Sequence, residues 1–169
     1  MIYIVTGKRN VGKTRALKEL LKMRSNCDGV LSVKVFERDV FKGYGLERVN
    51  KGWQYPFMIW DRNQEIEGRQ ERIGDFVLLE TGILKGQEII NHSISSEKDT
   101  VIDEVGQLEL RGKVFYKQVK RAVDLQRGDV GWDLYLVVRI QLLKQVIEYF
   151  EVDTYELIRV EEKELTECE

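Results

Sequence analysis

Residues 6–14 read TGKRNVGKT, and this stretch indicates the fold of the chain. It fits the pattern G-x-x-x-x-G-K-[ST], whose fixed positions are Gly7, Gly12, Lys13 and Thr14. The apolar run MIYIV precedes it and predicts a buried strand. The segment RALKELLKM follows, and its apolar residues fall on one face at helical spacing. A strand, a glycine-rich loop and an amphipathic helix in this order are typical of a phosphate-binding loop.

The residue types in this loop match what the binding of a phosphate chain requires. The glycines let backbone N–H groups approach phosphate oxygens, and the following helix directs its N-terminal N–H groups at the anion. Lys13 is expected to reach the β- and γ-phosphates, and Thr14 to ligate Mg²⁺ through its hydroxyl. The predicted contacts to a nucleoside triphosphate are Gly7, Lys8, Arg9, Asn10, Val11, Gly12, Lys13 and Thr14.

A pair of carboxylates supplies the second half of the predicted site. The run TVIDE has the pattern of a buried strand that ends in Asp103 and Glu104. Because Mg²⁺ prefers few protein ligands, Asp103 is expected to bind the metal together with Thr14. Glu104 is expected to orient or deprotonate the attacking water. Glu109, which stands between two leucines in GQLEL, is an alternative base, or else an acid at a helix start.

An arginine completes the predicted catalytic set. The run DLYLVVR predicts a strand that ends at Arg139, on the edge of the sheet where ligands bind in open α/β folds. There Arg139 is a candidate for stabilising charge that develops on the γ-phosphate, or else a surface arginine paired with an acidic side chain. Arg121 and Arg127 are weaker candidates. The predicted catalytic residues are therefore Lys13, Glu104 and Arg139.

The remaining patterns predict a single α/β domain over residues 1–169. Short strand-like runs between about 29 and 80, separated by Gly, Asn and charged turns, predict a small antiparallel β insertion. Helices are expected from an N-cap at Thr81, from about 113 to 126, and over QLLKQVIEYF, with a last strand in YELIRV. Strands that alternate with helices predict a mostly parallel sheet flanked by helices.

Aromatic residues gather in the predicted insertion. They have two interpretations, which are packing in the core and at the sheet edge, or a surface on which a nucleotide base stacks. The residues are Trp53, Tyr55, Phe57 and Trp60.

Composition limits the classes of function. The 169 residues are 43% hydrophobic and 33% charged, which suits a globular protein that buries a full core. With 27 basic and 29 acidic residues the net charge is −2, which disfavours nucleic acid as a partner.

No apolar run approaches the roughly 20 residues of a membrane span, and a signal peptide is not expected. Cys27 and Cys168 are expected to be free thiols in the cytoplasm, and the lone His92 argues against a zinc site. The oligomeric state is not predicted.

TGKRNVGKT together with VIDEVGQLEL resembles the nucleoside-triphosphatase family first described from thermophiles, to which a human cancer-related nucleoside-triphosphatase belongs. The second motif of that family reads like I-D-E-[IV]-G-x-[ML]-E-L, and residues 102–110 match it throughout. GVLSVKVF, GYGLE and RIGDF extend the resemblance over residues 2 to about 140, whereas FERDVFKGYG keeps the family's Glu-x-Arg arrangement only loosely.

The resemblance implies a P-loop NTPase with a RecA-like core and a small β insertion. It also implies Mg²⁺-dependent hydrolysis of ATP, GTP and other NTPs to NDP and phosphate, with broad base tolerance. Residues 7–14 would then bind phosphate, and Asp103 and Glu104 would serve the metal and the water.

Two other functions fit the same motifs. A nucleotide or small-molecule kinase would use the same loop and Asp103, with the aromatic insertion holding an acceptor, although arginine-rich lid segments are not evident in the sequence. An NTPase switch would turn over only with a macromolecular partner, and the acidic balance disfavours nucleic acid but not protein in that role.

Overall fold

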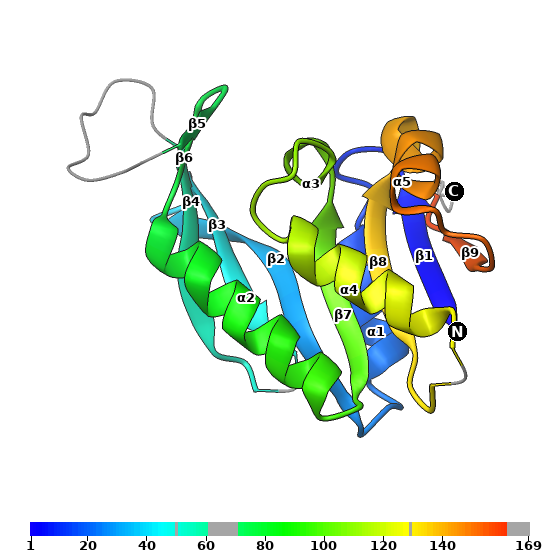
Figure 1. Ribbon diagram of the computed structural model, residues 1–169. Coiled ribbons are helices and arrows are strands. Elements are labelled where there is room, and N and C mark those ends of the chain that lie inside the picture. Colours follow the sequence, from blue (N-terminus) through cyan, green and yellow to red (C-terminus); the bar gives the residue numbers. More distant parts are fainter. Residues whose placement is uncertain (50, 61–70, 129, 162–169) are drawn as a thin grey trace, which may run out of the picture.

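The computed structural model describes residues 1–49, 51–60, 71–128 and 130–161, and its strands form one mixed sheet (Figure 1). Across the described part of the sheet the strand order is β5-β6-β4-β3-β2-β7-β8-β1-β9. Along the chain the elements are β1 (Ile2–Gly7), α1 (Lys13–Leu21), β2 (Cys27–Glu37), β3 (Val40–Arg48), β4 (Gln54–Trp60), β5 (Glu71–Ile73), β6 (Phe76–Leu78), α2 (Glu80–Ser95), β7 (Asp99–Val105), α3 (Gln107–Leu110), α4 (Tyr116–Gln126), β8 (Leu134–Arg139), the 3₁₀ helix η1 (Ile140–Leu142), α5 (Leu143–Phe150) and β9 (Glu156–Arg159).

Strand β2 joins two halves of the sheet that differ in strand direction. It pairs in parallel with β7, and the parallel half continues through β8 and β1 to β9. On its other side β2 pairs antiparallel with β3, and β4, β6 and β5 follow in the same manner. The α/β fold that the sequence predicts is confirmed. Its antiparallel strands extend the central sheet, since β2 belongs to both halves.

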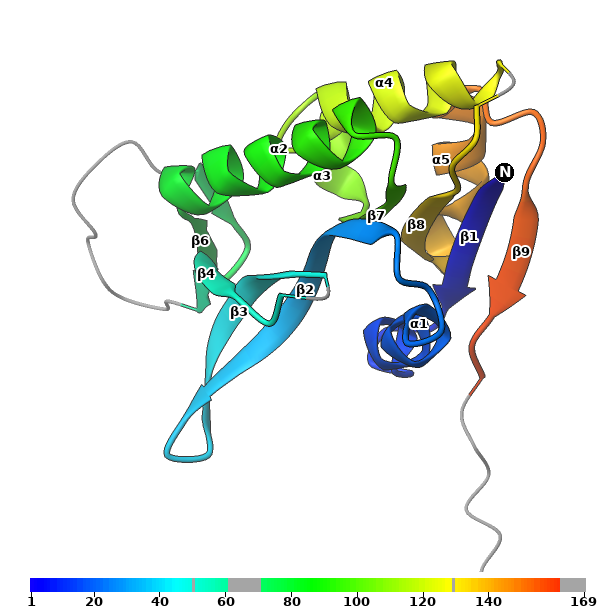
Figure 2. The ribbon, with the colours of Figure 1, turned by 90° about the horizontal axis from the view of Figure 1, so that it is seen from below.

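Helices cover both faces of the sheet (Figure 2). On one face α2, α4 and α5 bury their apolar sides against the strands through residues such as Ile90, Val119 and Val146. On the other face α1 packs Leu17 and Leu21 against the parallel strands. Burial of these side chains is the main force that holds each helix against the sheet. In this way α1 is fixed directly beyond the end of β1, with only the loop between them.

Two predicted helix starts differ from those in the structure. Helix α2 begins at Glu80, so Thr81 lies in its first turn and is not the N-cap. The N–H of Leu79 donates instead to the carbonyl of Phe57 at 2.9 Å, which fixes the start of the helix against β4. Helix α4 begins at Tyr116, later than predicted, because Val114 has a φ of +51° that a right-handed helix does not contain.

The aromatic residues of the antiparallel half pack among themselves and in the core. Phe57 is 5% exposed and stacks on Phe115 with ring centroids 5.8 Å apart. Trp53, in contrast, is exposed in the turn before β4. Trp60 lies against Phe41 at 5.7 Å. These contacts agree with the packing interpretation for Phe57 and Trp60.

A buried ion pair links the two halves of the sheet. Arg48 on β3 donates to both carboxylate oxygens of Asp28 on β2, from Nε at 2.9 Å and from Nη2 at 2.5 Å. Asp28 is 2% exposed. Burial would raise the pKa of Asp28, but the hydrogen bonds from Arg48 and from the N–H of Gly29 hold it below its usual value.

Replacing Arg48 is therefore expected to destabilise the fold. Arg48→Met should lower the free energy of unfolding by about 3 kcal/mol, because the buried Asp28 carboxylate loses both hydrogen bonds from Arg48 and keeps only Lys98, at 4.0 Å, as a cation among the described residues. Since the pKa of Asp28 is lower in the folded state, the stabilisation is present above the unfolded-state pKa and is lost as pH falls through the folded-state value. Urea unfolding at neutral pH measures it, with Arg127→Met at an exposed ion pair as the control. Equal losses in both variants would contradict this role for Arg48.

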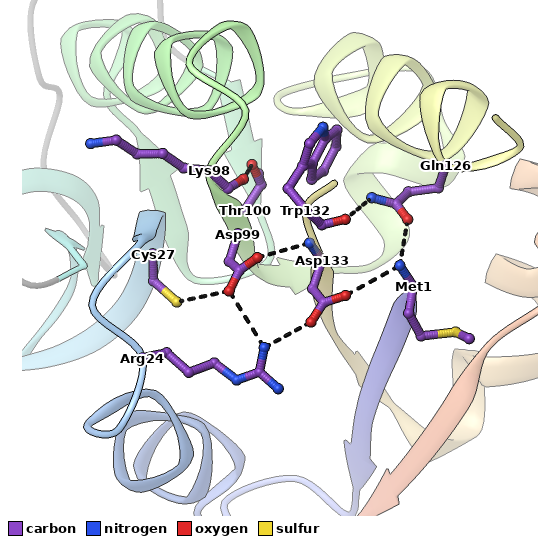
Figure 3. Close-up of polar contacts among 9 residues, drawn as sticks. All are labelled: Met1, Arg24, Cys27, Lys98, Asp99, Thr100, Gln126, Trp132 and Asp133. Carbon is purple, nitrogen blue, oxygen red and sulfur yellow. Dashed lines mark hydrogen bonds and ion pairs between the residues drawn. The ribbon is translucent and has the colours of Figure 1, made fainter. Parts of the chain in front are cut away.

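A polar network lies at the amino ends of the parallel strands, on the opposite edge of the sheet from the loop after β1 (Figure 3). Arg24 donates to Asp133 at 2.7 Å and to Asp99 at 3.4 Å, and the amino group of Met1 lies 3.2 Å from Asp133. The Arg24 guanidinium also lies 5.4 Å from the centroid of the Tyr135 ring. These contacts tie the segment after α1 to β7 and β8.

Cys27 borders this network. Its thiol lies 3.8 Å from Oδ2 of Asp99, and burial raises its pKa to about 12, so it is protonated at neutral pH. The other cysteine of the sequence, Cys168, lies outside the described residues. Across the part of the chain that the structure describes, no helix is long and apolar enough to cross a membrane.

Candidate active site

The loop between β1 and α1 has the backbone that a phosphate cradle needs. Gly12 directly precedes α1 with a φ of +94°, a left-handed conformation that strains any other residue type. A Cβ at Gly7 would lie 2.4 Å from the carbonyl oxygen of Val160, so close packing excludes a side chain there. The first turn of α1 contains no acidic residue. Its free N–H groups and the positive end of its dipole therefore remain available for an anion.

Lys13 is the first residue of α1, and its side chain turns back into the loop. It is 8% exposed, and its Nζ donates to the carbonyl of Lys8 at 2.8 Å and to that of Gly7 at 3.4 Å. Burial lowers the pKa of Lys13 below its usual value, and the nearby charge of Glu104 opposes this shift. Because water is partly excluded here, attraction between an ammonium at this position and a phosphate is stronger than at the surface.

Thr14 and Asp103 meet although 89 residues separate them in the sequence. The hydroxyl of Thr14 donates to Oδ2 of Asp103 at 2.6 Å, and the backbone N–H of Ser32 on β2 donates to the same oxygen at 3.3 Å. Asp103 is 2% exposed, and burial raises its pKa to about 7 despite the hydrogen bond from Thr14. A divalent cation beside this carboxylate would offset the cost of burying its charge.

This pair of oxygen ligands fits Mg²⁺. The ion favours octahedral oxygen coordination and keeps several waters, so one hydroxyl and one carboxylate are enough protein ligands when phosphate oxygens complete the shell. Among the described residues, no three or more His, Cys, Asp or Glu side chains cluster as a metal cage.

Glu104 and Arg139 come from neighbouring strands and form an ion pair. The pairing of β7 with β8 shifts its register between Asp103 and Val105, which places Glu104 in an irregularity of the strand. Strand β7 thus continues to Val105, and the prediction that it ends in the carboxylates is wrong by one residue. Glu104 accepts from Nε of Arg139 and from its Nη2, the latter at 3.4 Å. Arg139 is thus both at the site and paired with an acid, which combines the two interpretations of the sequence.

These groups line a cavity of about 430 Å³, which we call the phosphate cavity after the ligand expected there. Its lining contains Thr14, Asp103 and Glu104, and it extends along α1 to the hairpin of β2 and β3. Six basic side chains line it against three acidic ones, a balance that suits a polyanion such as a triphosphate. The basic residues are Arg9, Lys13, Arg15, Lys18, Lys34 and Arg139.

The structure divides the predicted loop contacts between two sides of the loop. Five of them line the phosphate cavity, namely Arg9, Asn10, Gly12, Lys13 and Thr14. Gly7, Lys8 and Val11 instead line a hollow behind the loop, next to the end of β9. No local motif in the sequence predicts the contributions of β2 and β3, such as the N–H of Ser32, because a backbone group on a distant strand can come from any residue type.

Glu109 occupies the start of α3 and does not line the phosphate cavity. It is 2% exposed and accepts from the N–H of Gly106 at 2.9 Å and from the N–H of Phe115 at 3.4 Å. Burial raises its pKa to about 7. Of the two roles that the sequence leaves open for Glu109, this geometry is that of the helix-start acid.

Comparison with known proteins identifies the family of the chain. A family model described as NTPase matches residues 2–164. The chain belongs to this NTPase family. The enzyme is therefore a nucleoside-triphosphatase, and the P-loop resemblance noted in the sequence is confirmed.

Two solved structures share the fold of this NTPase. The crystal structure of THEP1 from the hyperthermophile Aquifex aeolicus has a TM-score of 0.73 and 20% identity, over 95% of this chain and 90% of that one. The solution structure of a human cancer-related nucleoside triphosphatase has a TM-score of 0.70 and 19% identity, over 95% and 89% of the two chains. No curated protein matches the chain significantly in sequence.

Proposed function

We propose that this NTPase hydrolyses ATP, GTP and other nucleoside triphosphates to the diphosphate and phosphate, in a Mg²⁺-dependent reaction with broad base tolerance. The observation that carries the proposal is the hydrogen bond of Thr14 to the buried Asp103, at the end of a basic cavity that also holds Lys13. Glu104 and Arg139 lie beside this pair. Membership of the NTPase family supports the same reaction class.

Each side chain has a separate task in this proposal. Lys13 and the N–H groups of the loop bind the β- and γ-phosphates and hold the γ-phosphorus in place. Thr14 and Asp103 hold Mg²⁺, which supplies charge neutralisation to the phosphate oxygens when bound. Glu104 takes a proton from the attacking water, whose oxygen bonds to the γ-phosphorus as the bond to the bridging oxygen breaks. Arg139 keeps the Glu104 carboxylate oriented and adds positive charge to the cavity.

Broad base tolerance is proposed because the charged groups gather around the phosphate path. The cavity wall beyond the loop includes Val33 and the long side chains of Lys18 and Lys34. Flexible side chains of this kind contact a base without a fixed hydrogen-bond pattern. Phosphate release from ATP, GTP, CTP and UTP tests the point, since a selective enzyme would differ widely in kcat/KM among the four. A cytoplasmic location is proposed because the sequence contains only two cysteines, far apart, which suits a reducing compartment.

Removal of Mg²⁺ is expected to abolish this hydrolysis. With EDTA in excess, phosphate release should fall to the rate of the Lys13→Ala variant, because the phosphate charges would then face Asp103 with no cation between them. A colorimetric phosphate assay measures the rate, and adding excess Mg²⁺ back serves as the control. Hydrolysis that continues unchanged in EDTA would argue against a metal at Thr14 and Asp103.

A further inference from the structure

A second cavity of about 410 Å³ adjoins the phosphate cavity. The two cavities share Arg9, Ser32, Tyr44, Glu104 and Arg139 in their linings, so the ion pair of Glu104 and Arg139 is part of their junction. The second cavity is enclosed by β3 and β4, by the turn between β5 and β6, by α3 and by η1. Its volume lies in the range of small-molecule binding sites.

The walls of this second cavity differ in chemistry from those of the phosphate cavity. Phe57 and Phe115, which stack on each other, form part of its lining, and Met58 and Leu108 extend the apolar surface. The polar residues of its lining are Arg9, Ser32, Tyr44, Asp75, Glu104, Gln107, Glu109 and Arg139. Apolar walls with a few convergent polar groups are typical of sites for small ligands that have an apolar body and a polar end.

The position of the second cavity relates it to one end of a bound triphosphate. Lys13 is the group that reaches the β- and γ-phosphates, and Asp103 directly precedes Glu104 on β7. The γ-phosphate therefore lies at the Glu104 end, with the nucleoside at the other end of the phosphate chain. A ligand in the second cavity would face the γ-phosphorus and not the base.

We propose that the second cavity binds a small alcohol with an aromatic or branched aliphatic body, and that this alcohol competes with water for the γ-phosphoryl group. The inference rests on the proposed triphosphatase site. The hydroxyl oxygen of the alcohol bonds to the γ-phosphorus while the bond from phosphorus to the bridging oxygen breaks. Glu104 takes the hydroxyl proton, the nucleoside diphosphate leaves, and the product is a phosphate monoester.

The test uses the 169-residue chain with two probes, 2-phenylethanol and 3-methylbutan-1-ol. Saturation-transfer NMR in the presence of Mg²⁺ and ADP measures their binding. Met58→Trp fills the cavity from β4 and should weaken binding by about tenfold or more. Met23→Trp is the matched control, because Met23 is 92% exposed in the turn after α1. Leu108→Trp, from the opposite wall on α3, repeats the test if Met58→Trp fails to fold, as judged by circular dichroism.

The second readout is the fate of the label from ATP labelled at the γ-phosphate. We expect a labelled phosphate monoester with at least one probe and none with ethylbenzene, which has the body of 2-phenylethanol but no hydroxyl. The inference is overturned if no probe binds, if binding is unchanged by Met58→Trp and Leu108→Trp, or if bound probes yield no ester.

Those failures are distinct from a failure of the proposed hydrolysis. Release of labelled phosphate into water, well above the rate of Lys13→Ala, would show that the triphosphatase site works while the alcohol site does not. If wild type and Lys13→Ala release phosphate equally slowly without added alcohol, the proposed hydrolysis itself would be wrong.

Discussion

Lys13→Ala is expected to lower kcat/KM for nucleoside-triphosphate hydrolysis by about a thousandfold. The side chain of Lys13 is 8% exposed and is held inside the loop by two carbonyl groups, so its charge acts where water is partly excluded. An alanine would leave the loop with its N–H groups but without the ammonium that is expected to reach the β- and γ-phosphates. Both nucleotide affinity and turnover should fall, because the charge attracts the phosphates in the ground state and attracts the transition state, where charge develops, more strongly.

The matched control for Lys13 is Lys22→Ala. Lys22 follows α1 directly, and its exposed side chain pairs with Glu19. The control should leave hydrolysis unchanged, which separates loss of a specific charge from a general loss of basic character. Retention of more than about a tenth of the wild-type kcat/KM in Lys13→Ala would contradict the assignment of the loop as the phosphate cradle.

Glu104→Gln is expected to give the second large effect, a fall in kcat of about a hundredfold to ten-thousandfold with nucleotide affinity retained. The amide keeps the size of the carboxylate and can still face Arg139, but it cannot accept a proton from water. Steady-state phosphate release gives kcat, and equilibrium binding of a fluorescent nucleotide gives affinity. The split between the two quantities is the signature of a base, since a purely structural residue would not spare binding selectively.

Glu109→Gln is the comparison that decides between the two acids. Glu109 holds the N–H groups of Gly106 and Phe115 and does not line the phosphate cavity. Its replacement should lower the thermal unfolding temperature and change kcat only a few-fold, because an amide offers a single acceptor oxygen for the two donors. A large loss of kcat in Glu109→Gln together with a small one in Glu104→Gln would reverse the assignment.

The sequence predicts the parts of the site that depend on neighbouring residues. The loop requires a left-handed conformation at Gly12 and a lysine in the first turn of the helix that follows. Both requirements are local, so a short sequence motif contains them. The sequence also indicates the two carboxylates, because acidic residues that directly follow an apolar run mark the carboxyl end of a buried strand. Hydrophobic spacing likewise places Phe115, Val119 and Ala122 in the core, and all three are buried.

Features that depend on contacts between distant elements are the ones that sequence patterns missed. The start of α2 is set by the hydrogen bond of Leu79 to Phe57 on β4, so Thr81 is not the cap despite its residue type. The sequence of the antiparallel strands predicts an insertion. In the structure β2 pairs with β3 on one side and with β7 on the other, so these strands and the parallel half form one sheet. Strand pairing is a choice among partners far apart in the chain, and residue alternation alone does not specify it.

By itself, the sequence determined the fold class, and it predicted the phosphate-binding loop and the candidate metal-binding and water-activating acids. The tertiary structure decided which of these groups meet. It joins Thr14 to Asp103, pairs Glu104 with Arg139 across β7 and β8, and assigns Glu109 to the start of α3. The physical reason is that propensity, periodicity and glycine conformation act over a few residues, whereas burial and charge pairing depend on which strands lie side by side.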